Sequence, residues 1–190
     1  MAAFLCMKDL AMNELSWISE ARKHIGLREI KGAKHNPTIL AWLKDIGKYN
    51  KESTAWWRDD ETPWCGLFVG HCLGETWRYV VKNWFRAREW DNAQLMIKLD
   101  KPAYGCIVTF IRQGGGHVGF VVGVDAKGNL MVLGGNQGDE VKIAAFSRSR
   151  VTGYYWPSIW SGKAVKSSPL PGRYALPVLT SSGKLSTNEA

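Results

Sequence analysis

The sequence lacks long hydrophobic runs and has few cysteines. Every apolar run falls short of the ~18 residues of a membrane span, and the apolar start at residues 2–7 ends at Lys8 and Asp9 before a signal-peptide core could form. We therefore expect no membrane span and synthesis in a cytoplasm without a secretory signal. Four cysteines in 190 residues are too few for a disulfide scaffold. Cys65 and Cys72, on one expected helix, would lie about 10 Å apart, so reduced thiols are expected.

Common short motifs for metal and phosphate binding are also absent. The sequence contains no HxxxH, CxxC or HxH pair, although zinc ligands often have such spacings. His24 and His35 have no partner nearby in the sequence, so we expect surface or hydrogen-bonded roles for them. The glycine-rich stretch 113–116 lacks the Lys-Ser/Thr ending of a phosphate-binding loop. We expect no metal and no cofactor, with a zinc amidase that uses His and Cys ligands as an alternative.

Basic residues outnumber acidic residues by 25 to 17, which gives a formal net charge of +8. Charge of this sign attracts polyanions, whether nucleic acid, acidic lipid or an anionic cell wall, and does not choose among them. The apolar content of 45% is ample for the core of one domain.

Helical periodicity occupies the first part of the chain, and short strand-like runs occupy the second. Asn13 precedes a helix that should end at Gly26, and Asn36 and Pro37 open a second helix that should end at Gly47. From residue 104 onward, β-branched and aromatic runs alternate with glycine-rich or charged turns, which is typical of an antiparallel meander. Helices followed by strands predict an α+β domain. The expected strands are 104–111, 117–124, 130–133, 140–146 and 151–156.

One cysteine lies at the expected start of the most apolar helix. Thr62 is a good N-cap and Pro63 suits the first helical position, which would put Cys65 in the first turn. There the helix dipole and the unpaired N–H groups favour an anion, so we expect a lowered thiol pKa and a reactive thiolate. The helix is apolar on nearly all sides, so it should be central with only its first turn at a surface. A buried structural thiol is the alternative.

A nucleophilic cysteine needs a base within hydrogen-bonding reach and a group that orients this base. His71 is six residues from Cys65 on the same helix and would point about 120° away from it. His117 begins a strand behind three glycines, where the backbone can approach another element closely. Its face of the strand carries small residues, so the helix could lie on that face.

The hairpin that follows His117 determines which residue lies opposite it. A four-residue loop at 125–128 would place Asn136 there, and its amide oxygen could fix the imidazole tautomer. A two-residue loop would place Gly138 there instead.

Two other segments stand out by composition. Segment 48–61 is polar and carries Trp56 and Trp57, so we expect a loop that forms part of a cleft wall. From residue 157 onward Ser, Pro, Gly and Lys dominate without periodicity, which predicts little independent fold. We expect a folded domain at 1–160 and a basic, flexible tail at 161–190, whose removal should leave the core intact.

Three stretches, PWCGLFV at 63–69, GGGHVGFVVG at 114–123 and LGGNQ at 133–137, resemble a phage and prophage branch of the CHAP and NlpC-type papain-like cysteine amidohydrolases. The resemblance extends from about Trp17 to Pro157. It implies a papain-like fold, in which N-terminal helices and a central Cys-bearing helix pack on the antiparallel meander. Carried over, the nucleophile is Cys65, the general base is His117, and the orienting residue is Asn136, where related branches use His, Glu or Asp.

The resemblance implies hydrolysis of peptidoglycan amide bonds without a cofactor, as expected for a phage endolysin that is an N-acetylmuramoyl-L-alanine amidase or a peptide endopeptidase. The partners would be peptidoglycan and anionic wall or outer-membrane polymers, with no nucleic acid. The protein would stay in the host bacterial cytoplasm until its release to the wall. Alternatives are a secreted antibacterial amidase effector, a virion tail-associated wall hydrolase, and a non-enzymatic wall-binding or virion structural module with a Trp-rich binding surface. The expected substrate contacts are Trp64, Trp57, Gly115, Gly116 and Gln137.

Overall fold

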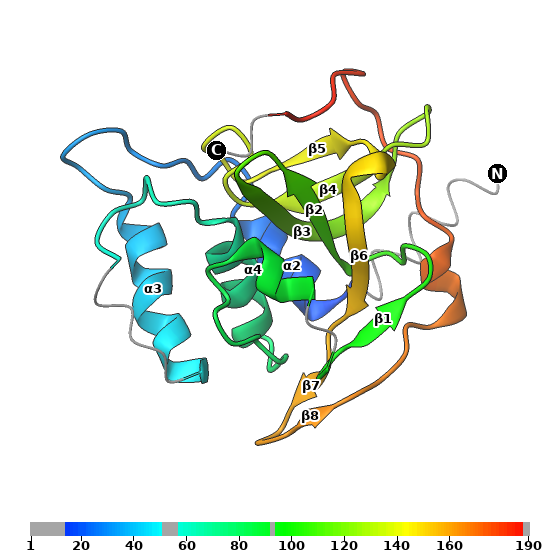
Figure 1. Cartoon of the computed structure of the whole chain (residues 1–190), viewed down its shortest axis with the longest axis horizontal. Helices are drawn as coiled ribbons and strands as arrows, with labels where there is room; N and C mark the ends of the chain where they lie inside the picture. Colours follow the sequence, from blue (N-terminus) through cyan, green and yellow to red (C-terminus); the bar gives the residue numbers. More distant parts are fainter. Residues whose placement is uncertain (1–13, 51–56, 92–93, 188–190) are drawn as a thin grey trace.

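The computed structural model describes residues 14–50, 57–91 and 94–187. Within these ranges, helices pack beside a strongly twisted sheet (Figure 1). This arrangement confirms the predicted α+β class. No helix in the described ranges has the length and apolar character that crossing a membrane requires. The α-helices are α2 (Ser16–Lys23), α3 (Pro37–Asn50) and α4 (Cys65–Gly74).

The main sheet has six antiparallel strands in the order β1-β6-β2-β3-β4-β5. Strands β2 to β5 follow one another as the predicted meander, but β6 returns to pair with β2. Strand β1, which is only three residues long and was not among the expected strands, pairs with β6. The strands are β1 (Ile97–Leu99), β2 (Ile107–Arg112), β3 (Gly115–Val124), β4 (Leu130–Gly134), β5 (Lys142–Phe146) and β6 (Val151–Trp156). A separate hairpin joins β7 (Ile159–Trp160) and β8 (Ala164–Val165), and 3-10 turns form η1 (Ala87–Asp91), η2 (Arg148–Arg150) and η3 (Pro171–Tyr174).

The predicted helix starts and ends are only partly right. Asn36 caps α3 as expected, because its side-chain oxygen accepts the Thr38 N–H at 2.9 Å. However, α3 continues to Asn50 and does not end at Gly47, since one glycine costs a helix only about 1 kcal/mol. Helix α2 ends at Lys23, and Gly26 (φ 92°) lies in the turn beyond it. The predicted cap at Asn13 lies outside the described residues.

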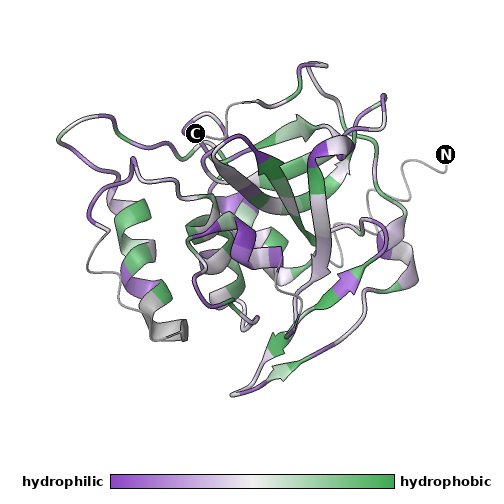
Figure 2. Cartoon of the chain, viewed as in Figure 1, coloured by the Kyte–Doolittle hydropathy of each residue, from purple (hydrophilic) through white to green (hydrophobic). Residues whose placement is uncertain are grey.

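Helix α4 is the buried centre of the fold, and all ten of its residues are buried. It packs against α2, α3 and β3, and its ribbon is apolar for most of its length (Figure 2). A Cβ added to Gly66 would collide with the Trp84 carbonyl oxygen, and one added to Gly70 would lie 2.5 Å from Ile46. These glycines therefore allow neighbouring segments to contact the helix backbone directly.

The C-terminal segment lies along the sheet. It has little regular structure, but the Val124 N–H donates to the Pro177 carbonyl at 2.9 Å, and the Leu179 N–H donates to the Val124 carbonyl at 2.7 Å. Farther along, the Ser186 N–H donates to Ala145 in β5 at 2.7 Å. The expected flexible tail did not include such contacts with the sheet. The effect of removing the tail stays a prediction. Backbone hydrogen bonds to strand edges do not require the apolar periodicity that sequence analysis detects.

Candidate active site

Cys65 is the first residue of α4, whereas the predicted N-cap at Thr62 would have made it the third. Trp64 occupies the N-cap position, and the Phe68 N–H donates to its carbonyl at 3.0 Å. The predicted cap at Thr62 is wrong, because its hydroxyl donates to Asp59 at 2.8 Å and its N–H donates to the same carboxylate at 2.7 Å. Asp59 thereby holds Thr62 in the turn before the helix.

The environment of the Cys65 sulfur differs from the sequence-based expectation. Cys65 is 3% exposed, and this burial raises the pKa of its thiol. Hydrogen bonds from the backbone N–H groups of Val118 and Gly66, and the positive charge of Arg112, oppose this shift. The helix N-terminus does favour the thiolate, as predicted, but desolvation has the larger effect, so the expected lowering of the pKa is wrong.

The hydrogen bond from Val118 joins Cys65 to β3 at the residue that follows His117. Strand β3 begins after a two-residue turn at 113–114, in which Gly114 has a φ of 79°. Gly116 must be glycine because a Cβ there would lie 2.8 Å from the Arg88 side chain and 2.9 Å from the Phe110 carbonyl. The glycines before His117 therefore serve the turn and the close packing of η1.

His117 is fully buried and lies on the face of the sheet opposite α4. Its ring stacks on Phe146 (5.3 Å between centroids, 4° between planes) and on Phe110, its partner in β2. Helix α4 contacts the other face, where the Phe68 and Phe120 rings are 6.4 Å apart. The prediction that the helix lies on the His117 face is therefore wrong, because α4 needs an apolar surface and the face that carries Phe120 provides it.

The pairing of β3 with β4 beyond the irregularity has the predicted register, but the loop that connects the strands is one residue longer than predicted. The loop spans 125–129, so Val124 pairs with Leu130, and an irregularity between Val121 and Gly123 then shifts the register by one residue. At this end the β3–β4 ladder stops at the pair of Phe120 with Leu133. Continuation of that pair would place position 136 opposite position 117.

Asn136 itself lies beyond the end of β4. It is 1% exposed, and its φ of 55° puts it in the left-handed region, which asparagine tolerates better than most residues. The chain therefore bends away from β3 just where the predicted strand would have continued. Gly134 lies close to the candidate base, because a Cβ there would be 3.2 Å from His117 Nε2.

Most of the expected substrate contacts lie in the interior. Trp64 is fully buried, and Trp57 is 5% exposed and stacks on Trp84. Gln137 is also buried, and its amide nitrogen donates to the backbone carbonyls of Val132, Gly134 and Lys142. These three side chains support the fold and offer no surface to a substrate. Gly116 is buried as well, and Gly115 is exposed at the start of β3.

Two residues near Cys65 were missed by the sequence analysis. Arg112 acts electrostatically on the thiol and donates from Nε to the Gly116 carbonyl at 3.3 Å. Gly135 allows the chain to pass over α4, because a Cβ there would be 2.6 Å from Phe68 and Trp64. The only sequence signal for Gly135 is the glycine pair before Asn136, and Arg112 has none.

Comparison with known families gives one match: residues 57–136 match the CHAP domain. A search of curated proteins and a search of solved structures each gave no match. The matched range includes Cys65, His117 and Asn136. The α+β architecture, with a Cys-bearing helix packed on a six-stranded antiparallel sheet, is consistent with the papain-like fold of CHAP domains. CHAP domains are typically cysteine amidohydrolases, which implies a cell-wall amidase or peptidase.

Proposed function

Because residues 57–136 match the CHAP domain, we propose that this protein hydrolyses peptidoglycan with Cys65 as its nucleophile. The observation that supports this most directly is the hydrogen bond from Val118 to the Cys65 sulfur. It brings the only cysteine at a helix start among the described residues to the strand position next to a histidine.

In the proposed mechanism, His117 is the general base and Cys65 attacks the carbonyl carbon of a peptidoglycan amide, which requires the His117 ring to leave its stack on Phe110 and Phe146 and turn toward the Cys65 sulfur. His117 takes the thiol proton, which is needed because burial keeps the pKa of Cys65 high. The new C–S bond gives a tetrahedral oxyanion. When the C–N bond breaks, the imidazolium gives its proton to the leaving amine and a thioester remains. His117 then removes a proton from water, which attacks the thioester, and the products are a carboxylic acid and the free thiol.

Backbone donors around the sulfur suit the charge that develops in this reaction. The N–H groups of Cys65 and Gly66 in the first turn of α4, and that of Val118 in β3, are directed at the sulfur. We propose that first-turn N–H groups stabilise the oxyanion, a contribution that is often worth 10²–10³ in turnover. Asn136 is proposed to orient the His117 imidazole.

The proposed biological role is that of a phage endolysin, which acts as an N-acetylmuramoyl-L-alanine amidase or as a peptide endopeptidase. The net charge of +8 favours approach to anionic wall polymers. In this role the protein accumulates in the host cytoplasm and reaches the wall through a membrane lesion. Expression in a bacterium should then cause lysis only after the membrane is permeabilised, and lysis without permeabilisation would contradict this role.

A non-enzymatic wall-binding module has lost its main support. That alternative required a Trp-rich surface, but of the tryptophans that the structure describes, only Trp77 is exposed. The others are buried or half-buried, and several stack within the core, as Trp42 does on His71. Burial of these rings removes the proposed binding platform.

The test is the release of soluble fragments from purified peptidoglycan by wild-type protein and by Cys65→Ala. We expect the variant to fold normally and to lose nearly all activity, because alanine provides no thiolate. The matched control is Cys72→Ala, since Cys72 is a buried thiol of the same helix. Substantial activity of Cys65→Ala would overturn the cysteine mechanism. Mass spectrometry of the fragments identifies the bond: a free lactyl carboxylate indicates an amidase, and a new peptide terminus indicates an endopeptidase.

A further inference from the structure

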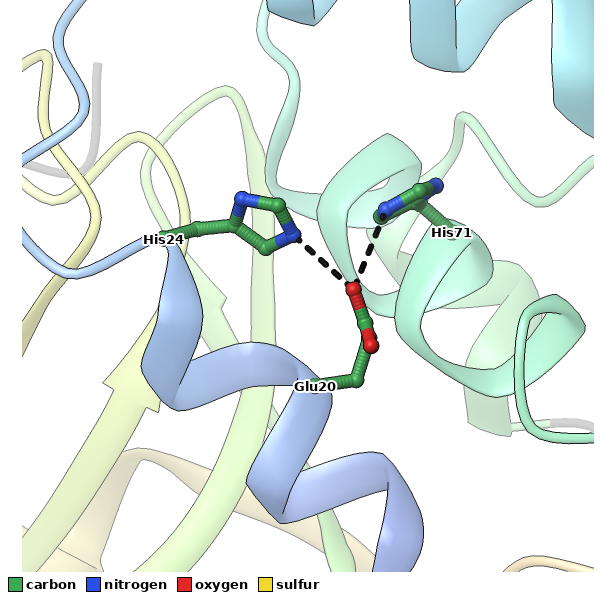
Figure 3. Close-up of side chains that lie close together, drawn as sticks. All are labelled: Glu20, His24 and His71. Atoms are coloured by element: carbon green, nitrogen blue, oxygen red, sulfur yellow. Dashed lines mark hydrogen bonds and ion pairs between the residues drawn. The ribbon is translucent and has the colours of Figure 1, made fainter.

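A second cluster of chemically active side chains lies where α2 meets α4. Figure 3 shows Glu20 on α2, His24 directly after the last residue of α2, and His71 on α4, with both imidazoles directed at one carboxylate oxygen. His24 Nε2 is 3.3 Å from Glu20 Oε1, and His71 Nε2 is 3.9 Å from the same oxygen. Potential ligand atoms of all three residues lie within 4.8 Å of one another. The cluster is separate from the candidate active site, because His71 is six residues, about 9 Å, along α4 from Cys65.

These separations suit a shared metal ion. Two ligand atoms that each lie about 2.0–2.2 Å from zinc at the tetrahedral angle are about 3.3–3.6 Å apart. The observed 3.3 and 3.9 Å are close to that value. In contrast, 3.9 Å is too long for a direct hydrogen bond between His71 and Glu20. Direct hydrogen bonding therefore explains the contact of Glu20 with His24 but not its contact with His71.

The burial and orientation of His71 also suit a metal ligand. The residue is 6% exposed, and its Nδ1 has no hydrogen-bond partner among the described residues. Trp42 stacks on the ring at 4.8 Å and contacts the His24 ring edge-on at 4.9 Å. Both imidazoles are thus held in place by packing.

The surrounding charge favours a cation. Lys23 binds Glu20 through the other carboxylate oxygen, Oε2, at 2.6 Å, which leaves Oε1 directed at the two histidines. Asp45 and Glu75 offer carboxylate oxygens within 4.8 Å of a ring nitrogen of His71. Carboxylates around a ligating histidine raise its basicity and strengthen metal binding.

We propose that Glu20, His24 and His71 bind one divalent transition-metal ion of the zinc class and so clamp α2 to α4. Two imidazoles and one carboxylate form a ligand set that zinc accepts, and partial exposure of Glu20 and His24 leaves room for water at the fourth position. Calcium and magnesium prefer oxygen ligands and should not compete. The clamp holds the helix that carries Cys65 from its far end and takes no part in the amide chemistry.

The test is isothermal titration of tag-free, chelator-treated full-length protein with Zn²⁺, together with Co²⁺ absorption as a report of coordination. We expect one saturable site and the visible bands of four-coordinate Co²⁺. Zinc at about 100 times its Kd should raise the melting temperature by about 5–10 °C. Glu20→Gln and His24→Ala should each weaken binding at least about 10-fold and abolish this rise. Absence of saturable binding to the wild-type protein would overturn the proposal.

Two controls separate this site from others. His35→Ala changes another half-buried histidine, which pairs with Asp60 at 3.0 Å, and it should bind zinc like the wild type. Cys65→Ala removes a thiol that could bind zinc at the candidate active site, and it should also keep the wild-type affinity. If Cys65→Ala loses the binding while His24→Ala and Glu20→Gln retain it, the metal belongs at the thiol and the clamp is wrong. Because the readouts are heat and absorption, the result does not depend on the proposed hydrolytic activity.

Discussion

The Cys65 sulfur accepts a hydrogen bond from the backbone N–H of Val118. Because the last pair of β3 with β4 is Phe120 with Leu133, this contact lies where the two strands have separated. The start of α4 therefore meets the backbone of β3 beyond the last β3–β4 pair, while the buried ring of His117 lies on the other face of the sheet. The residues that follow β4 lie close to both, and the first two predictions concern them.

Asn136 should matter for turnover through its amide group. Asn136→Gly keeps the left-handed backbone (φ 55°) available while it removes the amide. We expect lower kcat with a small change in stability, and a smaller loss than for His117→Ala, whose role as a general base is worth about 10²–10⁴. Assays of the single variants and of the double variant on peptidoglycan measure this.

The double variant should lose no more activity than His117→Ala alone, since an orienting group has nothing to orient without the imidazole. Asn136→Ala is a useful comparison, because its left-handed backbone should cost a further 1–2 kcal/mol or so of stability. Full activity of Asn136→Gly would make this residue structural.

The two glycines before Asn136 should respond differently to alanine. A Cβ on Gly135 would be 2.6 Å from Phe68 and Trp64, so Gly135→Ala should lower the free energy of unfolding by about 1–3 kcal/mol. A Cβ on Gly134 would be 3.2 Å from His117 Nε2, so Gly134→Ala should mainly lower kcat by displacing the imidazole. Urea unfolding and peptidoglycan assays separate the two effects.

Gly172→Ala is the matched control, because a Cβ at this exposed position in η3 meets nothing within 4 Å. It should change neither stability nor turnover. Equal losses of stability for Gly134→Ala and Gly135→Ala would show that the close contact of Gly134 with His117 supports the fold as a whole and not the orientation of the imidazole in particular.

The C-terminal segment should contribute to stability through its contacts with β3. Leu179 is partly buried against the core, whereas its neighbour Val178 is 70% exposed. We expect Leu179→Ser to cost about 1–2 kcal/mol, or roughly 2–8 °C in melting temperature, and Val178→Ser to stay within about 0.5 kcal/mol. Removal of residues 163–190 should lower the melting temperature more than Leu179→Ser does. An unchanged melting temperature after this truncation would restore the expectation of a dispensable tail.

Buried thiols should make the protein less stable in alkali. Burial raises the pKa of Cys106 from 9.0 to about 12. Between these values the unfolded chain releases a proton that the folded protein keeps, so stability is full below pH 9 and falls as the pH rises, by about 1.4 kcal/mol per pH unit for this group. Urea unfolding at pH 8, 9 and 10 under reducing conditions measures the slope.

Cys106→Ala should make the loss of stability per pH unit smaller. Part of the loss should remain, because burial also raises the pKa of Cys72. An identical slope in Cys106→Ala would assign the alkaline loss of stability to other groups.

The sequence by itself determined the local features of this fold. Apolar periodicity and caps depend on neighbouring residues, so they identified the helix that begins near Cys65, the cap at Asn36 and the α+β order. The strand 151–156 was predicted with its observed bounds. His117 lies near the start of β3, as the glycine run before it indicated.

Only the tertiary structure decided what depends on residues far apart in the chain. Alternation defined two faces of β3 but did not show that α4 would take the face with Phe120 and leave His117 on the other. Desolvation, which reverses the expected direction of the Cys65 pKa shift, comes from the whole surrounding fold. Glu20 and His71 are 51 positions apart, so no spacing motif could group them. Their meeting follows from the packing of α2 against α4, which long-range contacts fix and local periodicity does not encode.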